Sequence, residues 1–496
     1  MKNLRDPSTK TSDNQAVFLF VITMLLVFLI TLSPPADLDM WWHLSAGRAM
    51  WNNGEILQHD IFSYTRGGEP WTNAFWISDL LIFFFQSTGG FLAVALWASS
   101  MAVLTMAVVY KHAESPKVIR VLVIVLAAFA MAPVWSARPQ LFSFFLLALL
   151  DYFLSRKGES LNKSFWLLLP LFAIWPNLHG GFIFGFLLLA AFIVAKLVEP
   201  LLQNIDNGRE HQKRLSLLMG ITIVSGLIVG LNPNGLAIWK LPFYTVDVSM
   251  MIREWQSPNF HRLDLHPILW LLFLVMIGWG CSRRKISLFD LFKTLGFAYM
   301  TLYSQRSMAL FAIIAAPVAA RSLAVTWEDW KSAPIGLWLT RLQKKPVSKP
   351  LPGRLTKILN ITIVILVFVV IFFHSISLSS SALTNQYFPS GAVAWINDNR
   401  PQGRLFNSYN WGGYLTWELQ DYPLFIDGRA DLYGHEIIKQ WEQIIQATDE
   451  GFTLLDEWDI QLILVEPEMK IVDALPKNEW SVLYQDDVSI LLGRSR

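Results

Sequence analysis

Two carboxylates, Asp37 and Asp39, follow the first long apolar run of the sequence and precede the aromatic segment Trp41-Trp42-His43. In an extended segment, residues i and i+2 point to the same side, so the two carboxylates can act together. Such a pair can hold a divalent cation such as Mg²⁺ or Mn²⁺, or one member can act as a general base. The alternative is a solvated loop with a helix-capping Asp. The aromatic side chains suit a sugar ring or a phosphate, although two tryptophans are also typical of a membrane interface.

Four other side chains could meet a phosphate group. Arg48 could bind phosphate oxygens in a bidentate manner, or it could pair with Asp60. Arg138 and Arg306 lie among apolar runs, where an arginine needs an anion, and a lipid-linked phosphate would supply one. His179 could be a base, a ligand or a phosphate contact, or simply part of a turn built by Asn and Gly.

Two segments near the C-terminus could contact a sugar or an acceptor. Trp411 and Tyr414 flank a pair of glycines, and Asp427 and Arg429 follow a strand-like run. Loops at strand ends commonly carry binding groups. The alternative for the second segment is a tight turn in which an Arg–Asp pair holds the structure together.

The composition shows which elements must position these residues. The chain has 496 residues, 53% of them hydrophobic and only 16% charged, against roughly 25% charged residues in an average soluble domain. With a mean hydropathy of +0.40, the chain is predicted to be an α-helical polytopic membrane protein. The net charge of +2 does not suggest a nucleic-acid partner, and the one cysteine, Cys281, excludes an intramolecular disulfide and a cysteine-cluster metal site.

Apolar runs of spanning length predict about eleven transmembrane helices. The first run, near residues 17–32, lacks a cleavage site and is expected to be a retained helix. The run at 76–88 is interrupted by Asp79, so we expect it to be interfacial or re-entrant. The other runs lie near residues 90–110, 118–134, 138–154, 164–177, 180–199, 214–231, 267–281, 287–303, 306–321 and 357–376.

The loop charges predict the orientation. With about eleven crossings, the basic loops fall on one side, which the positive-inside rule makes the cytoplasm. The longest basic loop is 321–357. The N-terminus is then cytoplasmic, and the other side holds residues 35–88, 232–266 and a tail from about 377.

The tail is predicted to be an exoplasmic α/β domain of residues 385–496, following a membrane domain of residues 1–384. Strand-like runs at 403–406, 423–426 and 460–465 and a hairpin at 480–492 alternate with helical segments at 390–399 and 435–447. Such alternation is typical of an α/β layer.

Together these segments resemble the GT-C superfamily of polyprenyl-phosphate-sugar-dependent membrane glycosyltransferases, and most closely an uncharacterised bacterial branch. The motifs that carry the resemblance are Asp37-x-Asp39-x-Trp41-Trp42-His43-Leu44, Gly47-Arg48, Asp60-x-Phe62-Ser63, Trp175-x-Asn177-x-His179-Gly180-Gly181 and Asp427-Gly428-Arg429. The resemblance implies a polyprenyl-phosphate-linked sugar donor, a glycan, lipid or protein acceptor, and a bacterial cytoplasmic membrane. It also implies a catalytic acid in the first outer loop, by position Asp37 or Asp39.

Two family features are incomplete. Trp411-Gly412-Gly413-Tyr414 is similar to the acceptor motif of oligosaccharyltransferases but lacks its acidic residue, so peptide recognition is not implied. The second acidic site of many relatives is not evident either, which leaves the metal requirement open.

We take Asp39 as the first choice for the catalytic carboxylate, because it is nearer the Trp-Trp-His segment, and Asp37 as the second. Two alternatives remain open at this stage. A transporter or flippase would place charged or broken helices at mid-membrane, whereas the polar groups here gather on one side. A non-catalytic subunit of envelope polysaccharide assembly would share the fold.

Overall fold

The computed structural model describes residues 7–34, 37–157, 163–203, 209–241, 253–282, 284–331, 353–378 and 387–495. Three sequence-based expectations fall partly or wholly outside these residues. They are the basic loop at 321–357, of which 332–352 lies outside, the outer segment 232–266, of which 242–252 lies outside, and the boundary at 384/385.

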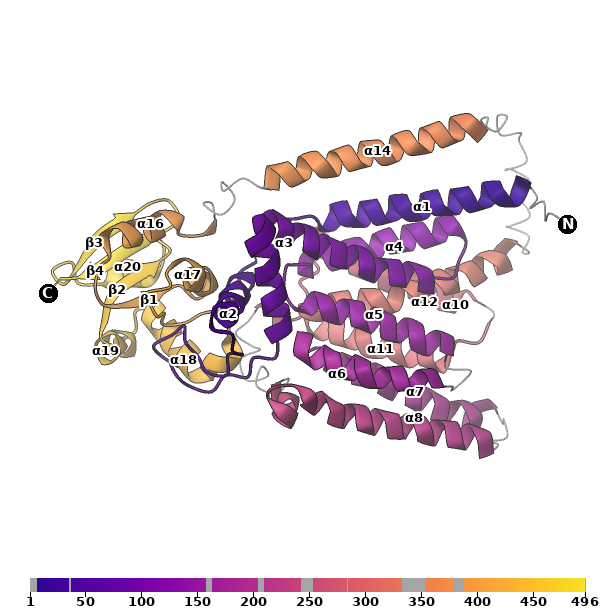
Figure 1. Ribbon diagram of the computed structural model, residues 1–496, viewed down its shortest axis with the longest axis horizontal. Helices are drawn as coiled ribbons and strands as arrows, with labels where there is room; N and C mark the ends of the chain where they lie inside the picture. Colours follow the sequence, from indigo (N-terminus) through magenta and orange to yellow (C-terminus); the bar gives the residue numbers. More distant parts are fainter. Residues whose placement is uncertain are drawn as a thin grey trace.

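A helical bundle forms the larger part of the molecule, and the tail caps one end of it (Figure 1). The helices of the bundle are α1 (Pro7–Thr31), the second part of α3 (Trp76–His112), α4 (Lys117–Met131), α5 (Gln140–Lys157), α6 (Leu168–Leu178), α7 (Phe182–Gln203), α8 (Arg209–Ile228), α10 (His266–Gly280), α11 (Leu288–Tyr303), α12 (Met308–Lys331) and α14 (Gly353–Leu378). Short 3-10 turns connect them: η1 (Ala132–Val134), η2 (Lys163–Leu167), η3 (Val229–Leu231), η4 (Gly235–Lys240), η5 (Arg253–Trp255), η6 (Leu263–Leu265) and η7 (Gln305–Ser307).

Eight helices in the described part of the chain are long and apolar enough to cross a membrane. The sequence predicts about eleven crossings from runs of apolar residues. The three further runs form α5, α6 and α11. These helices are shorter or more charged, since α6 has 11 residues, α11 has 16 and α5 carries Asp151 and Arg156. The multi-pass class is therefore confirmed, and the number of crossings stays a prediction.

The predicted interfacial segment 76–88 is the first part of α3. The helix breaks at Gly89 and Gly90, and Gly90 has φ 65°, a conformation that glycine adopts without steric cost. Before the break, α3 lies across the ends of the bundle helices beside α2 (Met40–Asn53), and after it α3 joins the bundle (Figure 1). This is the arrangement expected of an interfacial helix.

The tail is a small mixed α/β unit. Its strands are β1 (Arg404–Asn407), β2 (Ile460–Val465), β3 (Trp480–Gln485) and β4 (Ile490–Arg494), in the order β1-β2-β4-β3. The β1–β2 pair is parallel, and the other two pairs are antiparallel. The helices are α16 (Ser390–Asn399), η8 (Tyr409–Trp411), α17 (Gly412–Glu418), α18 (Ala430–Ile445), α19 (Asp449–Glu457) and α20 (Lys470–Ala474).

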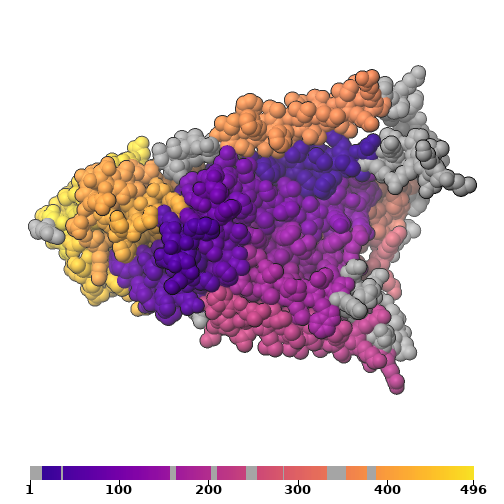
Figure 2. All heavy atoms as spheres, viewed as in Figure 1, coloured from indigo at the N-terminus to yellow at the C-terminus, as the bar shows by residue number. Residues whose placement is uncertain are grey.

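The strand expected at 423–426 is absent from the sheet as described. Leu424 instead forms single bridges to Leu405 and to Ser63 in the first outer loop. The backbone of Leu424 exchanges hydrogen bonds with this loop, since its N–H donates to Phe62 and its carbonyl accepts from Tyr64. The first outer loop and the tail are therefore one packed unit, in contact over the surface in Figure 2.

Candidate active site

The guanidinium of Arg138 holds three carboxylates together at the end of the bundle below the tail. Its Nε lies 2.5 Å from Asp37 Oδ1, its Nη1 lies 2.9 Å from Asp39 Oδ2, and its Nη2 lies 3.3 Å from Glu254 Oε1. The side chains of Asp37 and Arg138 are each 11% exposed, whereas Asp39 is 28% exposed. Asp39 is thus the more accessible member of the acidic pair.

The start of α2 fixes the two aspartates in different ways. Asp37 Oδ1 accepts the backbone N–H groups of Asp39 and Met40 at 2.9 and 3.2 Å, so it caps the first turn. Asp39 already has helical φ and ψ angles. The sequence predicted an extended segment here, and the chain turns into a helix instead. Both carboxylates still reach one cation, because Arg138 lies between them.

The same surroundings shift the two carboxyl pKa values in opposite directions. Burial raises the pKa of Asp37, but the charge and hydrogen bonds of Arg138 outweigh burial and leave it below the ordinary value. Burial is also the largest influence on the pKa of Asp39. Arg138 opposes it only in part, and the negative charges of Asp37 and Glu254 add to it, so that the pKa of Asp39 rises to about 6. A carboxylate with such a pKa is a better base than an ordinary Asp.

Arg306 is a cation without an anionic partner among the described residues. Its guanidinium lies 5.2 Å above the ring of Trp255, and it forms no ion pair within that part of the chain. The strongest charge acting on it is that of Glu254, followed by those of Arg138, Asp39 and Asp37, none of which is within ion-pair distance. A buried or half-buried guanidinium at this position offers its free N–H groups to an anion.

The two histidines predicted for the site also lie there. His43, one helical turn after Asp39, is buried and hydrogen-bonded through Nδ1 to Asp79 Oδ1 at 2.6 Å. His179 follows α6, and its Nδ1 lies 2.7 Å from Ser143 Oγ. Both rings lie within electrostatic reach of Arg306.

Asp427 and Arg429, expected to contact a sugar or an acceptor, are fully buried. Arg429 Nη2 lies 2.6 Å from Asp427 Oδ2 and 2.6 Å from Asp60 Oδ1, and all three side chains are 0% exposed. The guanidinium also lies over the ring of Trp71 at 4.7 Å. This geometry favours the structural alternative, in which the pair joins the tail to the first outer loop.

Three aromatic residues predicted to contact a ligand are likewise packed in the interior. Trp41 is 1% exposed, and Trp411 and Tyr414 are each 4% exposed. Tyr414 stacks on Phe388 with ring centroids 4.7 Å apart and meets Trp41 edge-on at 5.1 Å. Their packing holds the tail against α2, which leaves little of these rings for a sugar.

Arg48 and Trp42 also make their close contacts within the protein. Arg48, predicted to bind phosphate, lies 3.9 Å above the ring of Trp417 and donates to the Trp417 carbonyl at 2.8 Å. Trp42 is 6% exposed and lies 3.5 Å from the His43 ring. Arg48 therefore fastens α17 to α2, and Trp42 supports His43.

Sequence reasoning missed Glu254, Asp79 and Tyr409 as members of this region. Glu254 lies next to Arg253 in the sequence, a pattern typical of an ordinary exposed ion pair. Tyr409 belongs to the tail, and burial together with the charge of Asp39 raises its pKa. Only the fold brings these residues to Arg138, since they are far apart in the sequence.

The carboxylates do not fit a divalent cation in this arrangement. Asp37, Asp39 and Glu254 all converge on Arg138, whose positive charge takes the place that a metal would need. Among the described residues, no group of three or more His, Cys, Asp or Glu side chains is placed to hold a metal ion.

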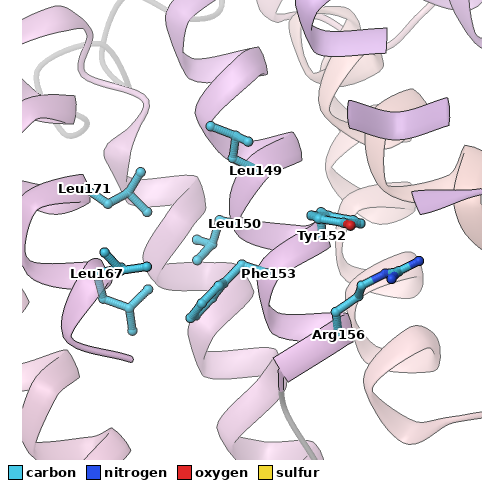
Figure 3. A pocket seen from close by; sticks show the side chains of 8 residues that line it. Leu149, Leu150, Tyr152, Phe153, Arg156, Leu167 and Leu171 are labelled. Carbon is cyan, nitrogen blue, oxygen red and sulfur yellow. The ribbon is translucent and has the colours of Figure 1, made fainter. Parts of the chain in front are cut away.

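A large cavity lies away from this site. It has a volume of about 610 Å³ and lies between α5 and α6, lined by Leu150, Tyr152, Phe153, Arg156 and Leu168 among others (Figure 3). It is mostly apolar and contains none of the residues around Arg138. A smaller cavity of about 120 Å³ borders Asp37 and is lined by Thr31, Trp135 and Ser136 among others. The chemistry favours the Arg138 region, because the charges gather there.

Comparisons with solved structures identify the fold. The oligosaccharyltransferase AglB from Archaeoglobus fulgidus, in complex with an inhibitory peptide and a dolichol-phosphate, matches with a TM-score of 0.59 and 12% identity, covering 92% of this chain and 70% of that chain. The chain shares the fold of the GT-C glycosyltransferases. The apo form of the A. fulgidus enzyme matches with a TM-score of 0.58 and 12% identity, over 91% of this chain and 70% of that chain.

A third structure, ArnT from Cupriavidus metallidurans bound to undecaprenyl phosphate, gives a TM-score of 0.44 and 11% identity, over 96% of this chain and 97% of that chain. This likeness is too weak to support an argument. No protein-family model matches the chain, and a search of curated proteins found no match.

Proposed function

We propose that the chain is a membrane glycosyltransferase that moves a sugar from a polyprenyl-phosphate donor to an acceptor on the tail side of the bundle. The observation that carries the proposal is the cluster around Arg138. It combines an accessible carboxylate of raised pKa with Arg306, a nearby cation that forms no ion pair among the described residues, at the end of the bundle that the tail covers. The fold shared with AglB supports it, because AglB is described with a dolichol-phosphate.

Asp39 is the proposed general base. The acceptor oxygen forms a bond to the anomeric carbon, and the hydroxyl proton passes to Asp39. The bond between the anomeric carbon and the phosphate oxygen breaks, and the phosphate leaves with the electron pair. Arg138 orients Asp39 at 2.9 Å, while Asp37 holds Arg138 at 2.5 Å and caps α2.

Arg306 is the proposed partner of the departing phosphate. Fixed positive charge aimed at developing negative charge stabilises a transition state without reorganisation of water. His179, within electrostatic reach of Arg306, would add a hydrogen-bond donor to the same group.

The acceptor class stays open among glycan, lipid and protein. The Trp411-to-Tyr414 segment does not support peptide recognition, because its two aromatic side chains are buried against α2 and Phe388.

The test is turnover in proteoliposomes with radiolabelled polyprenyl-phosphate sugars and extracted envelope glycans as acceptors. Wild-type protein should release polyprenyl phosphate and transfer label, and Asp39→Asn should not. Binding of the donor without turnover by either protein would favour the non-catalytic subunit. Movement of the donor between leaflets without bond cleavage would favour the flippase.

A further inference from the structure

A buried histidine–carboxyl pair adjoins the proposed site but has no part in the mechanism above. His43 Nδ1 and Asp79 Oδ1 lie 2.6 Å apart, with 4% and 0% of the side chains exposed. His43 is the only ionisable group within ion-pair distance of the Asp79 side chain in the described part of the chain. The side-chain amide of Asn73 also interacts with the Asp79 carboxyl group.

Two close contacts fix the position of this pair. At Gly47 of α2, an added Cβ would lie 2.2 Å from the Asp79 carbonyl oxygen. Only glycine lets α2 approach α3 closely enough for His43 to reach Asp79. The residue before Asp79 on α3, Ser78, donates to the carbonyl of Leu178 at 2.6 Å. The first turn of α3 is thereby joined to the segment that carries His179.

Burial determines where the proton of the pair lies. A buried carboxylate without a cationic partner is costly, so the neutral form is favoured. Asp79 then carries the proton and donates it to Nδ1 of His43. The imidazole keeps its own proton on Nε2. Burial, followed by the charges of Arg138, His179 and Arg306, lowers the pKa of His43 well below its ordinary value, so the ring is neutral.

His179 has the same tautomer for a different reason. Its Nδ1 accepts the backbone N–H of Gly181 at 3.0 Å. The Nε1–H of Trp175 donates to Ser143 Oγ at 2.7 Å, so the Ser143 hydroxyl donates to the same Nδ1. Nδ1 is thus an acceptor, and the proton lies on Nε2. Burial and Arg306 lower the pKa of His179 to about 3.

The two donors share one region. The His43 and His179 rings lie 5.3 and 5.6 Å from the ring of Phe75. Neither Nε2 has a hydrogen-bond partner among the described residues, and neither is an enclosed polar atom. Both Nε2 atoms therefore keep some contact with solvent, and both rings lie within electrostatic reach of Arg306.

We propose that His43 and His179 are two neutral Nε2–H donors that, together with Arg306, bind the phosphate of a polyprenyl phosphate. Asp79 fixes the tautomer and orientation of His43, and Ser143 and Gly181 do the same for His179. This inference rests on the proposed function. Neutral donors select and orient the phosphate oxygens, while Arg306 supplies the charge. Asp79 is then a positioning residue that acts through His43.

The first test does not depend on activity. Full-length protein with ¹⁵N-labelled histidine, in nanodiscs at pH 7, is measured by solid-state NMR. Several histidines should show an unprotonated Nδ1 and a protonated Nε2, because the Nε2 atoms of His211, His266 and His374 also face carbonyl oxygens. One of these signals should disappear in His43→Gln and another in His179→Gln. An Nδ1-protonated His43 would overturn the assignment.

The second test is the affinity for undecaprenyl phosphate in nanodiscs. Gln places an amide N–H near the Nε2 position, whereas Asn keeps only the contact with Asp79. His43→Gln should therefore bind nearly as wild type does, and His43→Asn should bind about tenfold more weakly. Asp79→Leu should weaken binding similarly, and melting curves check that each variant is folded.

Equal affinity of the Gln, Asn and wild-type proteins would remove His43 from the phosphate site. If wild-type protein does not bind undecaprenyl phosphate at all, the proposed function and this ligand both fail, whatever the tautomers. If it binds and turns over but His43→Asn is unaffected, only this inference fails.

Discussion

Asp37 and Asp39 share one guanidinium but differ in what else they contact. Asp37 also accepts two backbone N–H groups, which hold it in the charged form. Asp39 has no such bonds in the described structure, and the charges of Asp37 and Glu254 act on it. We expect Asp39→Asn to lower turnover by about 10²–10⁴-fold with the melting temperature nearly unchanged. Asp37→Asn should lower both, because it removes a cap and a buried ion pair.

The comparison is made by single-turnover rates and thermal unfolding of the purified variants. Wild-type turnover by Asp39→Asn, together with an inactive but stable Asp37→Asn, would move the base to Asp37.

The raised pKa of Asp39 predicts a pH dependence of the rate. A general base must be deprotonated, and the pKa of Asp39 is about 6. Turnover should therefore be full above this pH and fall tenfold per pH unit below it. An ordinary Asp would keep its activity down to about pH 4. Rates are measured from pH 4.5 to 8, with binding of undecaprenyl phosphate followed in parallel to separate chemistry from affinity.

Arg306 is predicted to bind the donor phosphate. A hydrogen bond to a charged group contributes about 1.5–3 kcal/mol, so Arg306→Gln should weaken binding of undecaprenyl phosphate roughly ten- to hundredfold. Arg262→Gln is a matched control, since Arg262 is exposed and paired with Asp264 at 2.5 Å. Equal losses in the two variants would indicate a general charge effect and contradict the assignment.

At the scale of elements, Gly413 determines how closely α17 can approach the start of α2. An added Cβ at Gly413 would lie 2.6 Å from the Leu38 carbonyl oxygen. Gly413→Ala should therefore force the tail away from α2 and cost about 1–3 kcal/mol. Gly296→Ala on α11 is the control, because its Cβ would meet open space. Unfolding midpoints of both variants in detergent test this, and equal midpoints would show that the interface adapts.

The sequence predicts elements best where one physical signal dominates. Apolar length places the long helices, and alternation places β1, β2 and the β3–β4 hairpin. The prediction of a strand at 423–426 fails. A strand needs a hydrogen-bonding partner over its whole length, whereas Leu424 forms only single bridges to two separate segments. The sequence also misses α17, a seven-residue helix that begins with two glycines and packs against α2.

The site could be predicted only in part for a related reason. Buried arginines among apolar runs indicate where an anion is needed, and this signal picks out Arg138 and Arg306. It does not tell a protein carboxylate from a ligand phosphate. In the structure Arg138 has protein partners and Arg306 has none within the described residues. Motifs such as Asp427–Arg429 look alike in sequence whether they bind ligand or hold the fold.

For the whole molecule, the two ends of the bundle differ in how their charges are paired. At the end away from the tail, Lys293 pairs with Asp151 at 2.6 Å and with Asp290 at 3.0 Å, and Arg321 pairs with Asp290 at 3.0 Å. These contacts tie α5, α11 and α12 together. At the tail end, Arg306 forms no ion pair among the described residues. The described charges thus tie helices together at one end of the bundle and leave a cation that could meet an anion at the other.

The orientation of the whole chain can be tested with its single cysteine. Cys281 is exposed at the end of α10, which the basic loops place in the cytoplasm. Asn397 on α16 is exposed in the tail. Only α11, α12 and α14 lie between them among the described helices. In sealed right-side-out vesicles, a membrane-impermeant maleimide should label Asn397→Cys made with Cys281→Ser, and it should label wild type only after permeabilisation.

The critical element is α11, whose 16 residues span about 24 Å against a hydrocarbon core of about 30 Å. If α11 does not cross, both cysteines lie on one side and label alike, and the predicted alternation is wrong from α11 onward. Labelling of Cys281 alone would reverse the orientation and move the proposed site to the cytoplasmic face.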